Sequence, residues 1–204
     1  MTALPIRPLL RQPVARQTGV VLIVAMIMLI IVSLLAAVAV RNATSSEGIN
    51  ANLRQTQLAT QAAESALRYC EDAAINTVNE GTGTFAFTSP SGSAIANLAL
   101  THIIAAPTGS NTPTSALPAN WDTTTNNGQL ILPLATVNLA GISTTFVRAP
   151  ECMIERARPD AAQSYLSVLT VTSRGFGPEV AAADSSRSRP VGSEVWLQST
   201  LELQ

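Results

Sequence analysis

The most prominent feature of the chain is an uninterrupted apolar run near its N-terminus. Residues 20–40 read VVLIVAMIMLIIVSLLAAVAV, in which Ser33 is the only polar side chain and no residue is charged. As a helix rising about 1.5 Å per residue, this run spans roughly 30 Å, the thickness of the hydrocarbon core of a bilayer. A helix buried inside a soluble domain would need a much larger protein around it. The run therefore predicts a transmembrane helix over residues 20–40.

A second pattern follows directly and predicts that the helix continues. No proline occurs between Val40 and Thr77, and Gly48 is the only glycine there. Apolar or small residues recur at steps of three and four: Ile49, Leu53, Thr56, Ala59, Ala63, Ala66 or Leu67, Cys70 and Ala74. This spacing predicts an amphipathic helix over residues 41–78 with one alanine-rich face that another element can approach closely. Gly48 is the expected place of a bend or local melting, because glycine costs about 1 kcal/mol inside a helix.

The remainder of the chain divides by composition into two regions. Residues 79–128 are rich in Thr, Ser, Asn, Gly and Pro and predict an irregular surface loop region, with residues 95–100 either a helical turn or an edge strand. Residues 129–204 contain short β-prone runs at 130–134, 137–139, 142–148, 152–155, 165–174 and 194–204. We therefore expect an α+β fold, in which the long helix packs on a C-terminal antiparallel sheet of four or five strands.

The charge pattern orients the predicted anchor and excludes several kinds of chemistry. All twelve basic residues are arginine. Without lysine, a P-loop, a Schiff base and a Ser-Lys dyad are excluded. Arg7, Arg11 and Arg16 precede the apolar run and no acid does, which predicts that residues 1–19 are cytoplasmic and that the chain beyond Val40 is exported. Beyond residue 19, nine arginines face thirteen acids, a net charge of about -4. We expect no direct nucleic-acid binding.

The two cysteines, Cys70 and Cys152, both lie on the predicted exported side. An oxidising compartment favours a disulfide between them, and two independent buried thiols are the alternative. In the chain-entropy model, closing a loop of this length stabilises a fold by about 4–5 kcal/mol.

A cleaved secretory signal peptide is the main alternative to an anchor. Ala37-Val38-Ala39 would be its small-residue cleavage site. However, the apolar run is longer than the roughly 7–15 residues usual for such peptides, and helical periodicity continues beyond it. An uncleaved anchor is favoured.

The segments RQTGVVLIVAMIMLIIVSLL and NLRQTQLATQAAESALR together resemble the start of type IV prepilins, and more closely that of PilX-type minor pilins. The positions that match the second segment of that family are Asn52, Leu53, Arg54, Leu58, Ala59, Gln61, Ala62, Ala63, Glu64, Ala66, Leu67 and Arg68. The resemblance covers residues 14–70, and the final strand, 195–200, is similar to that family's ending. It implies an αβ-roll, and removal of the leader 1–19 by prepilin peptidase between Gly19 and Val20. Val20 would then be the N-methylated first residue.

One position departs from the pattern of the major pilins. They generally carry a glutamate at the fifth mature position, which pairs with the N-terminal ammonium of a neighbouring subunit. The corresponding residue here is Val24, and residues 20–40 contain no acid. A carboxylate in lipid is costly unless a partner amine awaits it, and a subunit at the filament tip has no subunit ahead of it. We therefore expect this protein at or near the tip; a weakly incorporated subunit of the shaft is the alternative.

Few residues are candidates for chemistry. His102 lies among apolar residues and is interpreted as a structural histidine. The pairs Glu151 with Glu155, and Glu71 with Asp72, are interpreted as solvated surface acids.

Two further sets of residues are candidates for binding. Glu179 and Asp184 could help to bind calcium, but the dense Asp/Asn spacing of such loops is missing. Trp121 and Trp196 are either core or contact residues. With no catalytic motif, we expect no catalytic residue, metal site or cofactor, and the protein is not predicted to be an enzyme.

The resemblance implies a minor pilin of the bacterial inner membrane and the pilus fibre, with a single membrane pass and a periplasmic C-terminus. Its expected partners are other minor pilins, the major pilin, prepilin peptidase and the inner membrane. The resemblance also implies that the protein takes part in pilus assembly by lateral packing of helices, and thereby in twitching motility and cell adhesion. Two alternatives stay open: a minor pseudopilin of a type II secretion system, and an anchored periplasmic binding module or tip adhesin that uses the region around Trp121.

Overall fold

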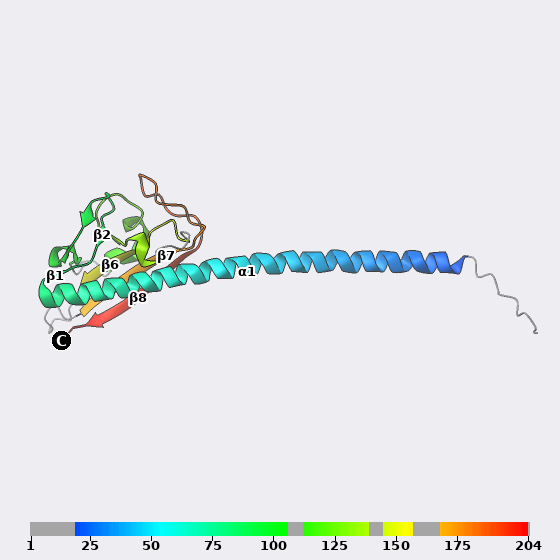
Figure 1. Cartoon of the computed structure of the whole chain (residues 1–204), viewed down its shortest axis with the longest axis horizontal. Helices are drawn as coiled ribbons and strands as arrows, with labels where there is room; N and C mark the ends of the chain where they lie inside the picture. The colour runs from blue at the N-terminus through cyan, green and yellow to red at the C-terminus, as the bar shows by residue number, and fades with distance from the viewer. Residues whose placement is uncertain (1–18, 106–111, 139–144, 157–167, 204) are drawn as a thin grey trace, which may run out of the picture. The chain divides into compact units, whose positions relative to one another are not determined.

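A computed structural model of the chain describes residues 19–105, 112–138, 145–156 and 168–203. Residues 1–49 and 50–204 form two separate units by their internal contacts. The helix α1, Val20–Glu80, is continuous through this boundary, and every described strand lies in the second unit (Figure 1).

α1 begins at the first residue of the apolar run and ends where glycine follows. Gly81, directly after the last helical residue, has a φ of 79°, a left-handed conformation that commonly ends a helix. The chain is helical at Gly48, so local melting is not found there, and a bend at this glycine stays a prediction. A side chain at this glycine would meet nothing within 4 Å.

The described residues of the second unit form two antiparallel sheets. β1 (Thr82–Gly83) pairs with β4 (Leu98–Ala99). The larger sheet has six strands in the order β3-β2-β5-β6-β7-β8. Their bounds are β2 Phe87–Thr88, β3 Ala94–Ile95, β5 Leu130–Ile131, β6 Glu151–Arg156, β7 Val168–Phe176 and β8 Glu194–Glu202. The described 3-10 turns are η1 Leu100–His102, η2 Thr114–Ala116, η3 Pro118–Asn120 and η4 Leu134–Thr136.

The α+β fold is as expected, with differences in the strands. The large sheet has six strands rather than four or five, because residues 79–128 contribute the two-residue strands β2 and β3. The run 137–139 forms no strand at its described residues, 137 and 138, and neither does 142–148 at residues 145–148. Residues 139, 142–144 and 165–167 lie outside the described residues.

The register of β6, β7 and β8 divides this part of the sheet into two faces. Directly paired residues in an antiparallel sheet point to the same side. Leu169 pairs with Leu201 and Val171 with Ser199 on one face, whereas Thr172 pairs with Gln198 and Arg174 with Trp196 on the other. α1 covers the first face, which we call the helix face (Figure 1). The second face, called the loop face below, is covered by segments that precede β5 and β8.

Small side chains allow α1 to approach the helix face closely. The buried residues of α1 are Ala59, Ala62, Ala63, Ala66, Cys70, Ala73, Ala74 and Thr77. A Cβ added at Gly175 of β7 would lie 2.2 Å from the backbone nitrogen of Ala63, so only glycine fits there. The Ser173 hydroxyl donates a hydrogen bond to the Ala63 carbonyl at 2.9 Å. The apolar stripe predicted from the sequence begins too early, since Ile49 and Leu53 remain exposed by 58% and 55%, and Thr56 is also exposed.

A disulfide between Cys70 and Cys152 links α1 to β6, with the two Cα atoms 6.6 Å apart. Cys70 and Cys152 belong to the same buried cluster as Leu98, Leu130, Ile154 and Val171. The bond closes a loop with a sequence separation of 82 residues.

Candidate functional site

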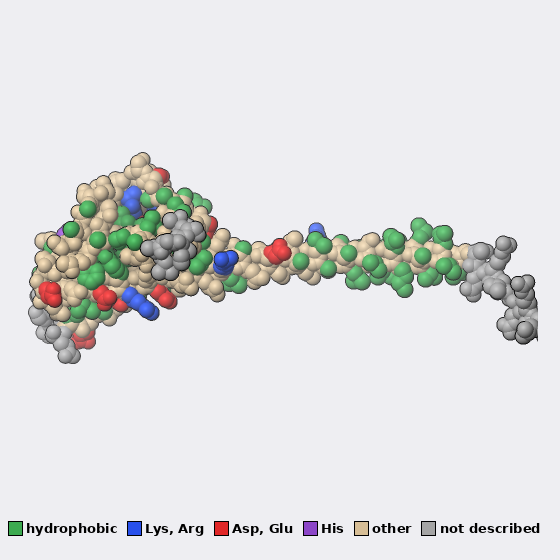
Figure 2. Space-filling view, viewed as in Figure 1, with side chains coloured by type: hydrophobic (Ala, Val, Ile, Leu, Met, Phe, Trp, Pro, Cys, Tyr) green, Lys and Arg blue, Asp and Glu red, His purple; other side chains and the backbone are tan. Residues whose placement is uncertain are grey.

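The first candidate site is the apolar N-terminal segment of α1, residues 20–40. Its side chains are all exposed, and no charged residue lies among them (Figure 2). α1 is long and apolar enough to cross a membrane, and its most apolar window is not buried against the rest of the protein. A helix satisfies its own backbone hydrogen bonds, so lipid or the apolar helices of other subunits can cover this segment.

The residues singled out for processing and assembly lie at the start of this segment. Gly19 immediately precedes α1, and Val20 is its first residue. Val20 is exposed by 70% and Val24 by 49%, and neither is covered by the described chain. This end of α1 therefore presents the Gly19–Val20 peptide bond at the very start of the helix. The apolar surface that follows carries no carboxylate that could pair with an amine.

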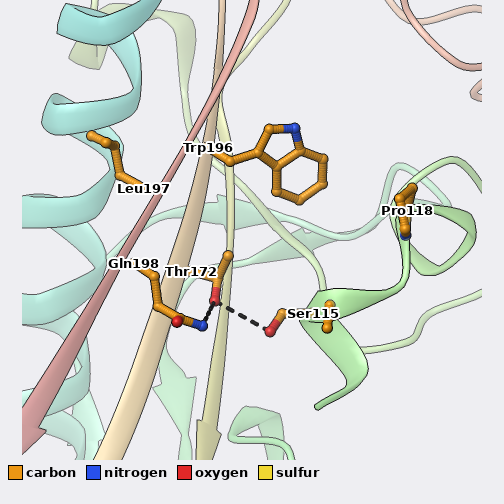
Figure 3. Close-up of a pocket in the computed structure, with 7 residues that line it drawn as sticks. Ser115, Pro118, Thr172, Trp196, Leu197 and Gln198 are labelled. Atoms are coloured by element: carbon orange, nitrogen blue, oxygen red, sulfur yellow. Dashed lines mark hydrogen bonds between the residues drawn. The ribbon is translucent and has the colours of Figure 1, made fainter. Parts of the chain in front are cut away.

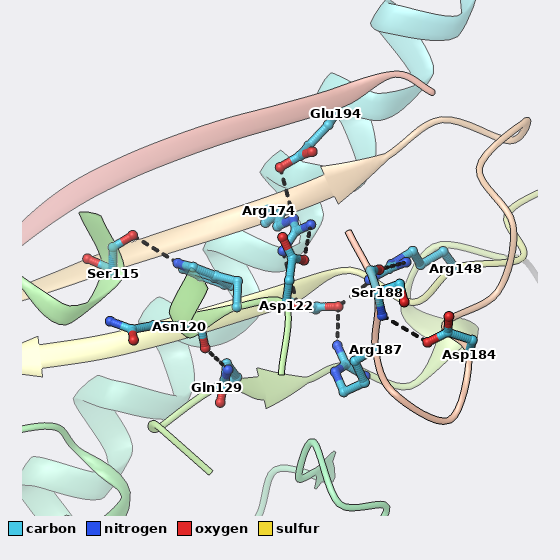
Figure 4. A network of polar contacts seen from close by, with 12 residues as sticks. Ser115, Asn120, Asp122, Gln129, Arg148, Arg174, Asp184, Arg187, Ser188 and Glu194 are labelled. Carbon is cyan, nitrogen blue, oxygen red and sulfur yellow. Dashed lines mark hydrogen bonds and ion pairs between the residues drawn. The ribbon is translucent and has the colours of Figure 1, made fainter. Parts of the chain in front are cut away.

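A second candidate site is an ionic cluster on the loop face, in which Glu151 of β6 is paired with three arginines. Figure 4 labels these arginines, Arg148, Arg174 and Arg187. Arg187 Nη2 lies 2.5 Å from Glu151 Oε1, while Arg174 Nη1 and Arg148 Nε each lie 4.0 Å from the carboxylate. Arg174 is also paired with Asp122 at 2.8 Å and Glu194 at 3.0 Å. All three arginines and Glu151 are buried. The three cations are thus matched by three carboxylates inside the unit.

The electrostatics of this cluster are dominated by burial. Burial raises the pKa of Glu151, and the guanidinium groups of Arg187, Arg174 and Arg148 oppose that rise. Burial also lowers the pKa of Arg148, whose guanidinium lies 4.8 Å from the Phe176 ring centroid. Stacking on an aromatic ring partly replaces the water that a buried cation loses. The described cluster therefore acts as an internal brace between β6, β7 and the loop that carries Arg187.

The expectation that Glu151 and Glu155 are solvated surface acids is wrong, since they are only 1% and 2% exposed. Glu155 receives backbone hydrogen bonds from Thr114 at 2.6 Å and Ser115 at 3.2 Å, and a further one from the Ser115 hydroxyl. It thereby caps the start of η2. The two acids point the same way from β6 but serve separate networks.

The remaining chemical candidates are held by local hydrogen bonds. His102 Nδ1 accepts a hydrogen bond from the Ala99 N–H at 3.0 Å, so a neutral ring carries its proton on Nε2. Asp184 accepts from the Ser188 and Ser186 amides at 2.8 and 3.1 Å, and Glu179 accepts from the Ser193 amide at 2.6 Å. Among the described residues, no group of three His, Cys, Asp or Glu could hold a metal ion.

Sequence reasoning missed the residues that hold the loop face together. Arg174 and Asp122 are 52 positions apart, and Arg187 and Glu151 are 36 apart, so no local spacing links them. The sequence did contain a signal for the helix face: a glycine in a strand, as at Gly175 directly after the β-prone run 165–174, often marks the close approach of another backbone.

The chain begins its long helix with an exposed apolar segment that has no charge, and the later part of the same helix packs on an antiparallel sheet. This arrangement is typical of a type IV pilin. Residues 18–68 match the family described as PilX N-terminal. Over this segment the chain is similar to the PilX-type pilins. This match supports a pilin-like role and association with other pilus components in general, and the long apolar helix fits anchoring in a membrane. No curated protein and no solved structure matches the chain.

Proposed function

We propose that this protein is a minor pilin that acts at or near the tip of a type IV pilus, in the complex of minor pilins that initiates assembly. The single observation that carries the proposal is Val24, within a segment of twenty-one residues that contains no acid. Other minor pilins and the major pilin are its proposed partners.

The proposed mechanism is lateral packing of the apolar segment, first in the inner membrane and then in the fibre. Among the described residues, every side chain of the segment 20–40 is exposed, which supports packing against neighbouring helices. Because lipid tails are as apolar as the segment, shape complementarity between helices rather than the hydrophobic effect would drive this packing in the membrane.

Processing is part of the same proposal. Prepilin peptidase would cut between Gly19 and Val20 and leave a methylated Val20, with the remaining chain on the periplasmic side. Intact-mass and N-terminal peptide analysis of the protein from its membrane tests this route. A mature start at Val40 would mean ordinary secretion and would contradict it.

The tip position is tested by Val24→Glu, compared with Val24→Gln and with Val32→Glu as a control for any acid in the segment. With tagged protein, we expect sheared pili to carry Val24→Glu at the same low copy number as the wild type. The reason is that a tip subunit has no amine ahead of it to pair with the new carboxylate. A marked rise of Val24→Glu alone along the shaft would show that the missing acid merely limits incorporation there.

A further inference from the structure

A cavity of about 270 Å³ opens on the loop face beside β8. Among the described residues, the polar side chains that line it are those of Ser115, Thr172 and Gln198 (Figure 3). Trp196, Pro118 and Ala116 supply apolar surface, and the indole of Trp196 extends from β8 towards the segment that carries Pro118. Ligand pockets usually measure about 300–1,000 Å³, so this cavity has room for one ring-sized group.

The polar side chains form a hydrogen-bond chain whose direction is fixed. Glu155 accepts the Ser115 hydroxyl proton, Ser115 Oγ accepts from Thr172 at 3.2 Å, and Thr172 Oγ1 accepts from Gln198 Nε2 at 3.0 Å. Because a carboxylate only accepts, every hydroxyl proton in the chain points inward towards Glu155. Gln198, an exposed residue at the outer end, still has one N–H and a carbonyl oxygen to offer among the described residues. An adjacent donor and acceptor of this kind match a pair of neighbouring hydroxyl groups.

The apolar wall is held rigidly in place. The Trp196 and Trp121 ring centroids lie 4.9 Å apart with the rings nearly perpendicular, at 84°. The Arg174 guanidinium lies 5.1 Å from the Trp196 centroid, and Arg174 is itself fixed by Asp122 and Glu194. Trp121 is fully buried and donates its indole N–H to the Ser115 carbonyl at 2.8 Å. The buried cluster therefore positions both walls of the cavity before any ligand arrives.

We propose that this cavity binds a neutral sugar ring, one pyranose unit of a glycan. A pyranose has an apolar C–H face, which suits Trp196 and Pro118, and neighbouring hydroxyls, which suit the free amide atoms of Gln198. None of the described side chains that line the cavity is charged, so an ionic ligand would leave its charge without a partner among them. The assignment does not depend on where the subunit sits in a fibre.

The test uses the full mature chain in dodecylphosphocholine, a detergent without a sugar headgroup. The probes are the methyl glycosides of β-galactose, β-glucose, α-mannose and N-acetyl-β-glucosamine. Binding is followed by saturation-transfer NMR and by the two indole N–H signals of the two tryptophans. Ligand-efficiency values for small molecules predict a Kd on the order of 1 mM for at least one probe, with a shift of the Trp196 signal.

Gln198→Ala is the main variant, because Gln198 is exposed and its loss leaves no cavity in the core. Loss of its hydrogen bonds should raise the Kd about 5- to 10-fold. Trp196→Ala should abolish binding. Thr200→Ala, an exposed residue on the same side of β8 outside the cavity, is the matched control and should bind as the wild type does.

Three results would overturn the proposal. One is the absence of saturable binding to any probe up to about 100 times the expected Kd. Another is an unchanged Kd in Gln198→Ala. The third is a shift of the Trp196 signal by a hexaproline peptide but by none of the glycosides, which would make the cavity a peptide site.

Discussion

The two faces of the sheet formed by β6, β7 and β8 are packed in opposite ways. The helix face meets α1 through alanines, Gly175 and a disulfide, with backbone close to backbone. The loop face meets irregular segments through large side chains, among them Trp121, Trp196, Phe176 and three arginines. One face therefore depends on shape and the other on charge pairing.

The difference shows how each kind of covering element is held. A helix is a regular surface, so small residues at helical spacing suffice to fit it to a flat sheet. A loop has no regular surface and leaves backbone polar groups that need partners, so it is fixed by specific side chains such as Glu155 beneath η2. Four predictions follow from this contrast, in decreasing order of their expected effect.

Removing the covalent link on the helix face should have the largest effect. Replacing both Cys70 and Cys152 by alanine should lower the free energy of unfolding by about 4–5 kcal/mol, because the bond restricts a loop of 82 residues in the unfolded chain. Urea unfolding followed by tryptophan fluorescence measures this change. Wild-type protein treated with a thiol reductant is the control and should lose a similar amount. A difference below about 1 kcal/mol in the free energy of unfolding between the variant and the wild type would mean that closing this loop contributes little to the stability of the fold.

On the loop face, Glu151→Gln should cost about 3 kcal/mol or more. It leaves Arg187 and its two buried neighbours with one carboxylate fewer, and an uncompensated buried charge is expensive. Glu202→Gln, an exposed acid at the end of β8, is the matched control and should change stability little. In a double-mutant cycle, Glu151→Leu with Arg187→Met should be more stable than either single variant. If the losses of unfolding free energy in the two single variants simply add in the double variant, charge pairing is not what stabilises the loop face.

Gly175→Ala tests shape complementarity on the helix face. The added methyl group would lie 2.2 Å from Ala63 N and 2.4 Å from Ala59 O, both backbone atoms that can move only with the helix. We expect a loss of about 2–3 kcal/mol in urea unfolding. Gly48→Ala is the control, because its methyl group meets nothing within 4 Å, and it should leave the unfolding of the second unit unchanged. Equal stability of Gly175→Ala and the wild type would contradict close packing.

The smallest effect concerns the loop before β8 and depends on pH. Hydrogen bonds from Ser188 and Ser186 lower the pKa of Asp184 from 3.8 to about 2. A carboxylate with a lowered folded-state pKa contributes stability above its unfolded pKa and loses it as the pH falls through the folded value. The stability difference between the wild type and Asp184→Ala should therefore be present at pH 6 and shrink between about pH 4 and pH 2. A difference that stays constant with pH would assign the effect to something other than the carboxylate.

The helix and its small-residue face could be predicted from the sequence because their signals are local. Residues 20–40 and the alanines at steps of three and four need no knowledge of distant segments. The short strands could not be predicted, since β2, β3 and β5 have two residues each and show no periodicity. Glu151 and Glu155 lie on either side of Met153 on the same face of β6. Acids that alternate with apolar residues along a strand usually indicate that the face carrying the acids is solvated. It misleads here because residues 115–122 and the loop before β8 cover that face.

In the proposed fibre subunit, the disulfide would also have a mechanical consequence when the protein is pulled through its N-terminal helix. Tension that enters α1 reaches Cys70 and can pass through the sulfur bridge into the centre of the sheet at Cys152. The chain between these cysteines, including β1 to β5, then lies outside the covalent path of the load. Under force, the stretch of chain that carries η2 and η3 would keep its fold, and with it the Ser115 and Pro118 side of the cavity.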